Sequence, residues 1–243
     1  ERRELDNTVA QEASAWVYCN CDPDEDFGIV IGKEEWHVGV IGIVASKMVE
    51  KFHRPAILLS VGEDGIARGS GRSIPGFHLL DALNGCSDVL EGFGGHAAAA
   101  GMTLKSTKIS QFREKFNSVV KKMITQEDLI PVVTADAEIS LSQITPKFFR
   151  ILKEMEPFGP GNMRPSFYCR DLKHRYSPRV VGTNHLKMTV VSEGSVMDAI
   201  GFNFGDRIGD VTRENTFGLV FSLDENEWNG KVSLQMKVKG VST

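Results

Sequence analysis

The pattern that most constrains the fold is a strand, helix, strand unit near the start of the chain. FGIVIGK (27–33) predicts a buried strand, GVIGIVASKMVEKF (39–52) a helix, and RPAILLSV (54–61) a second strand. Two strands joined through a helix favour parallel pairing with a right-handed crossover. The first part of the chain is therefore expected to be of the α/β class, led by an amphipathic helix over residues 1–17.

The same domain is expected to continue to about residue 130. IARGSGRS (66–73) predicts another strand that ends in a glycine-rich loop, and short helical pieces follow from Phe77 to Leu90. MTLK (102–105) predicts a short strand. The helix expected over 109–124 places these apolar side chains on one face: Phe112, Phe116, Val119 and Met123.

The pattern changes after Pro131. VVTADAEISL (132–141) predicts a strand, and a helix over 145–155 has Thr145 as its N-cap and Pro146 at its first position. Beyond it, five segments alternate apolar and polar residues, and an Asn-Gly pair at 229–230 signals a hairpin between the last two. We therefore expect an all-β part, a small barrel of the OB type, over 131–243.

Composition narrows the class of protein. The net charge of −4 excludes an overall basic field, so a nucleic-acid site has to be a local patch. No apolar run has the length of a membrane span, which indicates a soluble, cytoplasmic protein without a membrane partner. Four cysteines without a C-x-x-C pair favour reduced thiols over a zinc site.

The RGSGRS segment is a candidate phosphate-binding loop. Arg68 and Arg72 would offer guanidinium groups, while Ser70, Ser73 and the glycines would offer hydroxyl and backbone N–H donors. An ordinary hairpin loop with solvated arginines explains the same composition. The residues alone leave both interpretations open.

A second candidate is GFGGHAAAAGM (92–102). His96 could stand at the start of a helix whose free N–H groups favour an anion, with Gly94 and Gly95 allowing close approach. The alternative is a histidine that only caps or packs. In either case the alanines are expected to be structural, because a helix without bulky side chains lies close against a sheet.

Basic residues gather in the first two strands of the expected barrel, and they are interleaved with His174, Tyr176 and His185. Such a mixture is typical of a groove for single-stranded nucleic acid, in which charge follows the backbone and rings stack on bases. A solvated barrel face is the competing interpretation. The basic residues are Arg170, Lys173, Arg175, Arg179 and Lys187.

Five motifs follow one another along the chain: WHVGVIGIVASK, GSGRSIPGFHLLDAL, GFGGHAAAAGM, MEPFGPGN and ENEWNG. In this order they resemble the RecJ family of single-strand-specific exonucleases. Gly-Gly-His followed by Ala-Ala-Gly is the signature of the DHH-associated domain, which that family shares with other phosphodiesterases. The resemblance implies a connector helix over 1–18, a DHH-associated domain over 19–130 and an OB-fold domain over 131–243.

The resemblance also implies a role in DNA repair and recombination, with degradation of single-stranded DNA from its 5′ end. The Asp-His-His motif and the aspartates that hold Mn²⁺ or Mg²⁺ in this family are absent from these residues, so no catalytic residue, metal site or cofactor is expected here. A first residue other than Met indicates a piece of a longer chain. The piece is expected to grip DNA without cleaving it.

By position in the motifs, Ser70 and Arg72 are implied to contact phosphate, and Gly94, Gly95 and His96 to hold the terminal nucleotide. Lys47 stands where many relatives have arginine, and it keeps the charge but loses the bidentate fork. A single-strand-binding protein or a helicase is an implied partner. Two alternatives stay open: a phosphodiesterase fragment acting on short oligonucleotides, and an OB-type module that docks proteins.

Overall fold

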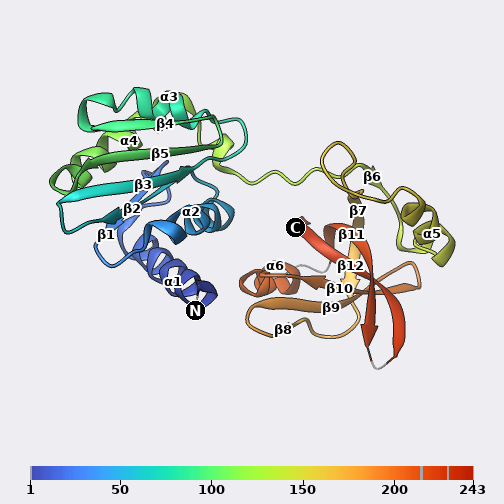
Figure 1. The fold of residues 1–243 in the computed structure, drawn as a ribbon. Coiled ribbons are helices and arrows are strands. Elements are labelled where there is room, and N and C mark those ends of the chain that lie inside the picture. The colour runs from blue at the N-terminus through green and yellow to red at the C-terminus, as the bar shows by residue number, and fades with distance from the viewer. Residues whose placement is uncertain (1, 214–215, 229, 243) are drawn as a thin grey trace. The chain divides into compact units, whose positions relative to one another are not determined.

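The computed structural model describes residues 2–213, 216–228 and 230–242. The chain divides into two compact units, Glu1–Pro131 and Val132–Thr243. Each has its own core, and we describe each by itself (Figure 1). In the described part of the chain, no helix is both long and apolar enough to cross a membrane.

The first unit is a five-stranded mixed sheet with helices on both faces. Its order is β1 (Ile29–Lys33), β2 (Ala56–Val61), β3 (Ile66–Arg72), β5 (Ala99–Lys105) and β4 (Gly92–Gly95). β1 and β2 are parallel and are joined through α2 (Val38–Phe52), as expected from the sequence. The other pairs, β2 with β3, β3 with β5 and β4 with β5, are antiparallel.

The two faces of this sheet are covered to different extents. α1 (Arg2–Asn20) and α2 pack on one face, over Ile29, Ile31, Ala56 and Leu58. α3 (Leu79–Asn84) and α4 (Ile109–Met123) pack on the other, where the core extends across β2, β3 and β5. Short 3-10 turns complete the unit at Ser87–Val89, Ser106–Lys108 and Glu127–Leu129. Figure 1 shows β4 at the sheet edge, away from α1 and α2.

Two local predictions in this unit are wrong. GFGGHAAAAGM is not the start of a helix; it forms the hairpin of β4 and β5. Four alanines are too few to form a stable helix alone, and each flanking glycine destabilises a helix by about 1 kcal/mol relative to alanine. Ala99 and Ala100 begin β5 and pair with β3 on one side and β4 on the other, and the Ala97 and Ala98 carbonyls in the turn accept from the Leu79 and Ser73 N–H groups.

RGSGR is likewise not a loop, because it lies inside the central strand β3. Gly69 and Gly71 point into the core, and a Cβ at Gly69 would lie 2.4 Å from Met102 Sδ. These glycines make room for neighbouring side chains rather than for a ligand. In α4, Phe112, Phe116 and Val120 are buried, whereas Met123 is exposed.

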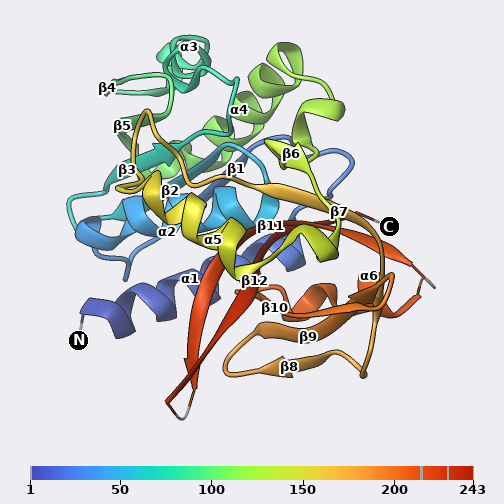
Figure 2. The same cartoon turned by 90° about the vertical axis from the view of Figure 1, so that its right-hand side faces the viewer.

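The second unit is built around a barrel (Figure 2). β7 (Phe167–His174), β11 (Phe217–Trp228), β12 (Lys231–Ser242), β10 (Ser195–Gly201) and β9 (His185–Ser192) pair in that order, and β9 returns to β7. This closed five-stranded arrangement, with β10 and β12 parallel, is an OB fold. Its core includes Leu172, Val190, Ala199 and Phe221.

The shorter elements of this unit depart in part from expectation. α5 (Pro146–Glu154) begins as predicted, with the Thr145 hydroxyl accepting from the Phe148 N–H at 3.1 Å. The strand expected over 132–141 shrinks to β6 (Ala137–Glu138), followed by a 3-10 turn at Leu141–Gln143. The sequence did not predict β8 (Arg179–Val181), the 3-10 turn Gly205–Arg207 or α6 (Ile208–Arg213).

The β11–β12 hairpin has the two-residue connection that the Asn-Gly pair predicts. Trp228 pairs with Lys231, and Gly230 has a φ of +73°. Asn229 lies outside the described residues.

Candidate nucleic-acid interface

One side of β3, β5 and β4 is open to solvent. On these strands alternate residues face the core, including Ala67, Ala100 and Met102, and the residues between them face outward; α2 approaches this side along β3, next to Ser70 and Arg72. We call this outward surface the open face. It comprises Arg68, Ser70, Arg72, Gly92, Gly94, Ala99, Gly101 and Thr103.

The open face is nearly free of side chains on β4 and β5. Gly92, Gly94 and Gly101 are exposed. A Cβ at Gly94 would meet nothing within 4 Å, and one at Gly101 would meet only the Gly69 carbonyl oxygen, at 3.8 Å. The fold itself therefore has room for side chains that the sequence does not provide. A glycine in a strand often marks a place where a ligand approaches the backbone.

Arg72 and Ser70 form the polar border of this face beside α2. Arg72 Nη1 donates to Ser70 Oγ at 3.0 Å and to the Gly71 carbonyl at 2.8 Å. Both side chains lie close to Gly42 of α2, where a Cβ would come within 3.1 Å of Arg72 Nη2 and Ser70 Oγ. No carboxylate pairs with Arg72 in the part of the chain that the structure describes, so its charge is available to an anion.

His96 lies in the turn between β4 and β5, next to this border. Arg72 is paired with Ala99 across the β3–β5 ladder, and the His96 N–H donates to the Ala99 carbonyl at 2.8 Å. The imidazole is exposed and caps no helix. Gly95 has a φ of +150°, and a Cβ there would lie 2.4 Å from the Ala99 carbonyl oxygen. Gly95 thus shapes the turn, whereas Gly94 keeps the surface flat.

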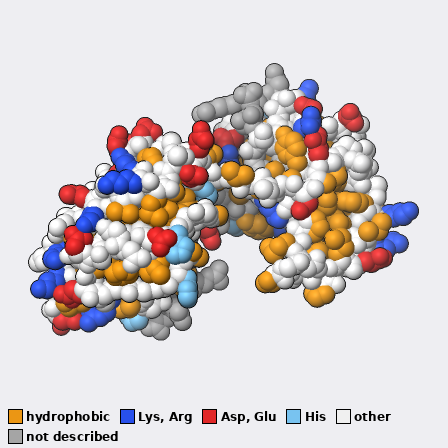
Figure 3. Space-filling model, turned by 90° about the horizontal axis from the view of Figure 1, so that it is seen from above, with side chains coloured by type: hydrophobic (Ala, Val, Ile, Leu, Met, Phe, Trp, Pro, Cys, Tyr) orange, Lys and Arg blue, Asp and Glu red, His pale blue; other side chains and the backbone are white. Residues whose placement is uncertain are grey.

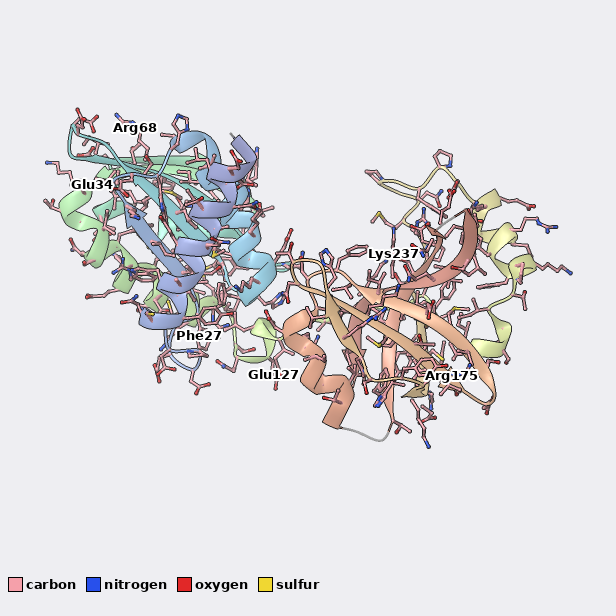
Figure 4. All side chains as sticks on the ribbon, turned by 90° about the horizontal axis from the view of Figure 1, so that it is seen from below. Phe27, Glu34, Arg68, Glu127, Arg175 and Lys237 are labelled. Atoms are coloured by element: carbon pink, nitrogen blue, oxygen red, sulfur yellow. The ribbon has the colours of Figure 1, made fainter. Side chains whose placement is uncertain are left out.

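The structure separates two predicted residues from this group. Arg68 folds toward the β2–β3 turn and pairs with Asp64 at 2.8 Å, which holds the pKa of the Asp64 carboxyl below its usual range. Figure 4 places Arg68 near the same end of the unit as Glu34. Lys47 on α2 donates to Asp6 of α1 at 2.8 Å, so its amine joins the two helices.

On the barrel, Arg179 of β8 lies directly opposite Lys187 of β9. The ladder continues through Ile200 of β10 to Lys237 of β12. We call Arg179, Lys187 and Lys237 the basic row. Lys237 pairs with Asp224, but the described residues give neither Arg179 nor Lys187 a carboxylate partner. Like charges directly across a ladder destabilise it, unless an anion lies between them.

The rings of His185 and Phe202 lie next to the basic row. His185 and Phe202 meet edge to face, with ring centroids 5.1 Å apart, and the Asn203 N–H donates to His185 Nδ1 at 3.2 Å. Tyr176 is exposed, and the Arg175 guanidinium lies 5.5 Å from its ring centroid. Phe202 is not among the residues predicted from the sequence. It directly follows the alternating pattern of β10, and an aromatic residue at that position could have indicated a stacking ring.

The remaining basic candidates lie elsewhere. Arg170 pairs with Glu138 of β6, and together with Lys173 it lines a hollow that also contains Asp171 and Glu193. This hollow has mixed charge and is separate from the basic row. Figure 4 likewise shows Arg175 and Lys237 at different places on the unit. In the view of Figure 3, basic and acidic side chains alternate without forming one continuous basic band.

The described residues contain no group of three or more His, Cys, Asp or Glu side chains that could hold a metal ion. All four cysteines are free thiols. Burial raises the pKa of Cys21 and of Cys86 to about 11, so both thiols are protonated at neutral pH.

Comparison with known proteins agrees with both units. Residues 25–122 match the DHHA1 domain model, and residues 135–240 match the RecJ OB domain model. The single-stranded-DNA-specific exonuclease RecJ of Bacillus subtilis is 39% identical over 214 residues, which are 87% of this chain and 27% of that protein. RecJ of Escherichia coli is 35% identical over 222 residues, 88% of this chain and 38% of that protein.

Among solved structures, RecJ of Thermus thermophilus in complex with Mn²⁺ superposes with a TM-score of 0.78 and 26% identity. The match covers 100% of this chain and 34% of that one. The chain thus spans roughly a third of the length of the relatives that it matches. The RecJ OB match also decides against the short-oligonucleotide phosphodiesterases left open by the sequence. The chain belongs to the RecJ family, of which it contains a DHHA1 domain followed by a RecJ OB domain.

Proposed function

We propose that this chain binds single-stranded DNA as part of an exonuclease of the RecJ kind, acting from the 5′ end in DNA repair and recombination. The observation that carries the proposal is the basic row of the OB barrel, where Arg179 and Lys187 face each other without a carboxylate partner among the described residues, next to His185 and the exposed ring of Phe202. Guanidinium and ammonium groups follow a phosphate backbone, and rings stack on bases.

In this proposal the open face receives the terminal nucleotide. Arg72, with Ser70 and His96 beside it, binds the 5′-phosphate, and the exposed glycines let the sugar and base lie against the strands. Support comes from the charge of Arg72, which has no carboxylate partner among the described residues, and from the exposed glycines Gly92, Gly94 and Gly101 on the open face of β4 and β5. Guanidinium groups bind phosphate oxygens bidentately, which fixes both position and orientation.

We further infer that these residues grip the strand and that hydrolysis depends on a DHH domain outside this sequence, in which Mn²⁺ or Mg²⁺ would act. A single-strand-binding protein or a helicase remains a proposed partner of the whole enzyme. If the inference about hydrolysis holds, the chain of 243 residues incubated with Mn²⁺ and 5′-phosphorylated single strands yields no cleavage above background. Robust cleavage would contradict it.

The DNA-binding proposal is tested by a salt titration with a long single strand. Each lost phosphate contact lowers the slope of log K against log salt by about 0.7. The double variant Arg179→Gln/Lys187→Gln should therefore lower it by about 1.4. Lys147→Gln/Arg150→Gln removes the same charge from the exposed face of α5 and serves as the matched control. Equal slopes for the two double variants would reject the basic row as the binding surface.

A further inference from the structure

The loop that follows Arg72 holds the turn that carries His96. This loop, SIPGFH (73–78), runs from the end of β3 to the start of α3, and Ile74 and Phe77 fix it in the core with 3% and 4% of their surface exposed. Neither the basic row nor the phosphate contacts proposed above involve these residues. The RecJ-like motif GSGRSIPGFHLLDAL nevertheless extends through them.

Two backbone N–H groups, one at each end of the loop, donate hydrogen bonds to the turn between β4 and β5. Ser73 N–H donates to the Ala98 carbonyl at 3.0 Å, and Leu79 N–H donates to the Ala97 carbonyl at 2.9 Å. The turn is also held by the His96 N–H bond to the Ala99 carbonyl and by the pairing of Ala99 with Arg72, whereas its alanine side chains offer no hydrogen bonds. Its place relative to Arg72 therefore depends in part on how far apart these two donors are held.

The hydroxyl of Ser73 helps to set that separation, together with the bond from the Phe77 N–H to the Ile74 carbonyl at 3.3 Å. Ser73 Oγ lies 2.8 Å from the Phe77 carbonyl oxygen and 3.1 Å from the Ile74 carbonyl oxygen, and it can donate to either. This bond closes the loop on itself, so that both of its ends face the turn. Ser73 also follows Arg72 directly in the chain, so its backbone bond to Ala98 extends the contact between β3 and the His96 turn beyond the Arg72–Ala99 pair.

We propose that Ser73 is a positioning residue that holds His96 at the correct distance from Arg72 for both to contact one terminal phosphate. The proposal rests on the terminal-phosphate site proposed above. Ser73 does not contact the DNA in this arrangement; it acts through the turn. Loss of its hydroxyl should leave Arg72 in place on β3 and let the His96 turn shift.

The test compares a matched pair of variants. Ser73→Thr keeps the hydroxyl, and Ser73→Val has the shape of threonine without it. The quantity measured is the ratio of the dissociation constants for a 5′-hydroxyl and a 5′-phosphorylated oligodeoxynucleotide. Ser73→Val should lower this ratio about 3- to 10-fold, which corresponds to the loss of one hydrogen bond, and Ser73→Thr should preserve it.

A double-mutant cycle separates positioning from general stability. If Ser73 acts through His96, Ser73→Val has no further effect on the ratio once His96→Ala is present, because the group being positioned is gone. Ser60→Ala is the control for stability: it also removes a serine hydroxyl bonded to a main-chain carbonyl, that of Trp36, but far from the turn. Its ratio should equal that of the wild type.

The possible failures are distinguishable. A wild-type chain that binds both oligonucleotides equally overturns the terminal-phosphate site itself. A wild-type preference for the phosphate, combined with losses from Ser73→Val and His96→Ala that multiply, overturns only the role of Ser73. A ratio that falls equally in Ser60→Ala also overturns it, because loss of stability would then explain the effect.

Discussion

Replacing a glycine on the open face should stabilise the protein and weaken its binding to single-stranded DNA. Gly101 lies in β5 with extended backbone, and a Cβ there would meet only the Gly69 carbonyl oxygen, at 3.8 Å. Gly101→Ala should therefore fold without strain. Replacing glycine at a compatible position stabilises a protein by about 0.4–1 kcal/mol, because the unfolded chain loses conformational freedom.

The same methyl group should weaken DNA binding. If the sugar and base lie against β5, a methyl group moves them away and removes roughly ten atom contacts of about 0.1–0.2 kcal/mol each. The sum is about 1–2 kcal/mol, or roughly tenfold in Kd. The melting temperature of the first unit should rise by about 2–4 °C while Kd for single-stranded DNA increases.

Gly69→Ala is the matched control on the other face of the same ladder. Its Cβ would lie 2.4 Å from Met102 Sδ and 2.5 Å from Leu59 Cδ2, so the core would be overpacked at a cost of about 1–3 kcal/mol. Calorimetry and fluorescence anisotropy measure the two quantities on one preparation. A Gly101→Ala chain that is more stable and binds DNA with unchanged affinity would refute the placement of the strand on β5.

Three further predictions address the turn, the helix pair and the thiols. Gly95→Ala should destabilise the first unit by about 1–3 kcal/mol, measured by thermal unfolding, because its Cβ would lie 2.4 Å from the Ala99 carbonyl oxygen at a φ of +150°. Lys47→Met should lower stability through loss of its bond to Asp6, whose side chain is 15% exposed, and leave the salt slope of DNA binding unchanged; a smaller slope would support the DNA contact predicted from the sequence. Burial raises the pKa of Cys21 and Cys86 from 9.0 to about 11, so the protonated thiol is favoured in the folded state and the free energy of unfolding should fall as pH rises from 9 to 11. At pH 8, iodoacetamide should accordingly label the exposed Cys19 well before these two, and equal labelling rates would contradict the burial argument.

The elements that the sequence predicted well are those in which local signals and tertiary packing agree. The strand, helix, strand unit has apolar runs of the right length on both sides of an apolar helix, and it forms as expected. The cap of α5 depends only on Thr145 and Pro146, which lie next to each other in sequence. The barrel strands alternate because one face of each is buried.

The candidate site was harder to predict from the sequence, because it depends on which strands become neighbours in the sheet. Helix propensity favoured a helix at the four alanines, and long-range pairing with β3 overrode it. The basic residues of the barrel read as one group in sequence, yet Arg170 pairs with Glu138 while Lys187 lies across from Arg179. Spacing along the chain contains neither relation.

The RGSGR segment shows which part of this information a sequence does hold. If the segment is a loop, its glycines and arginines all belong to one phosphate-binding surface. If it is a strand, alternate residues face opposite sides of the sheet, so the glycines and the polar residues have different roles. Gly69 and Gly71 lie on the face that Leu59, Met102 and Leu79 fill, so a larger residue at either position would clash with these side chains. Ser70 and Arg72 fall on the opposite face, where Gly101 and Ala99 are their partners across the ladder. Glycine on the filled face is explained by the fold, whereas glycine on the open face is not, and that difference is what makes the open face the surface to test for a ligand.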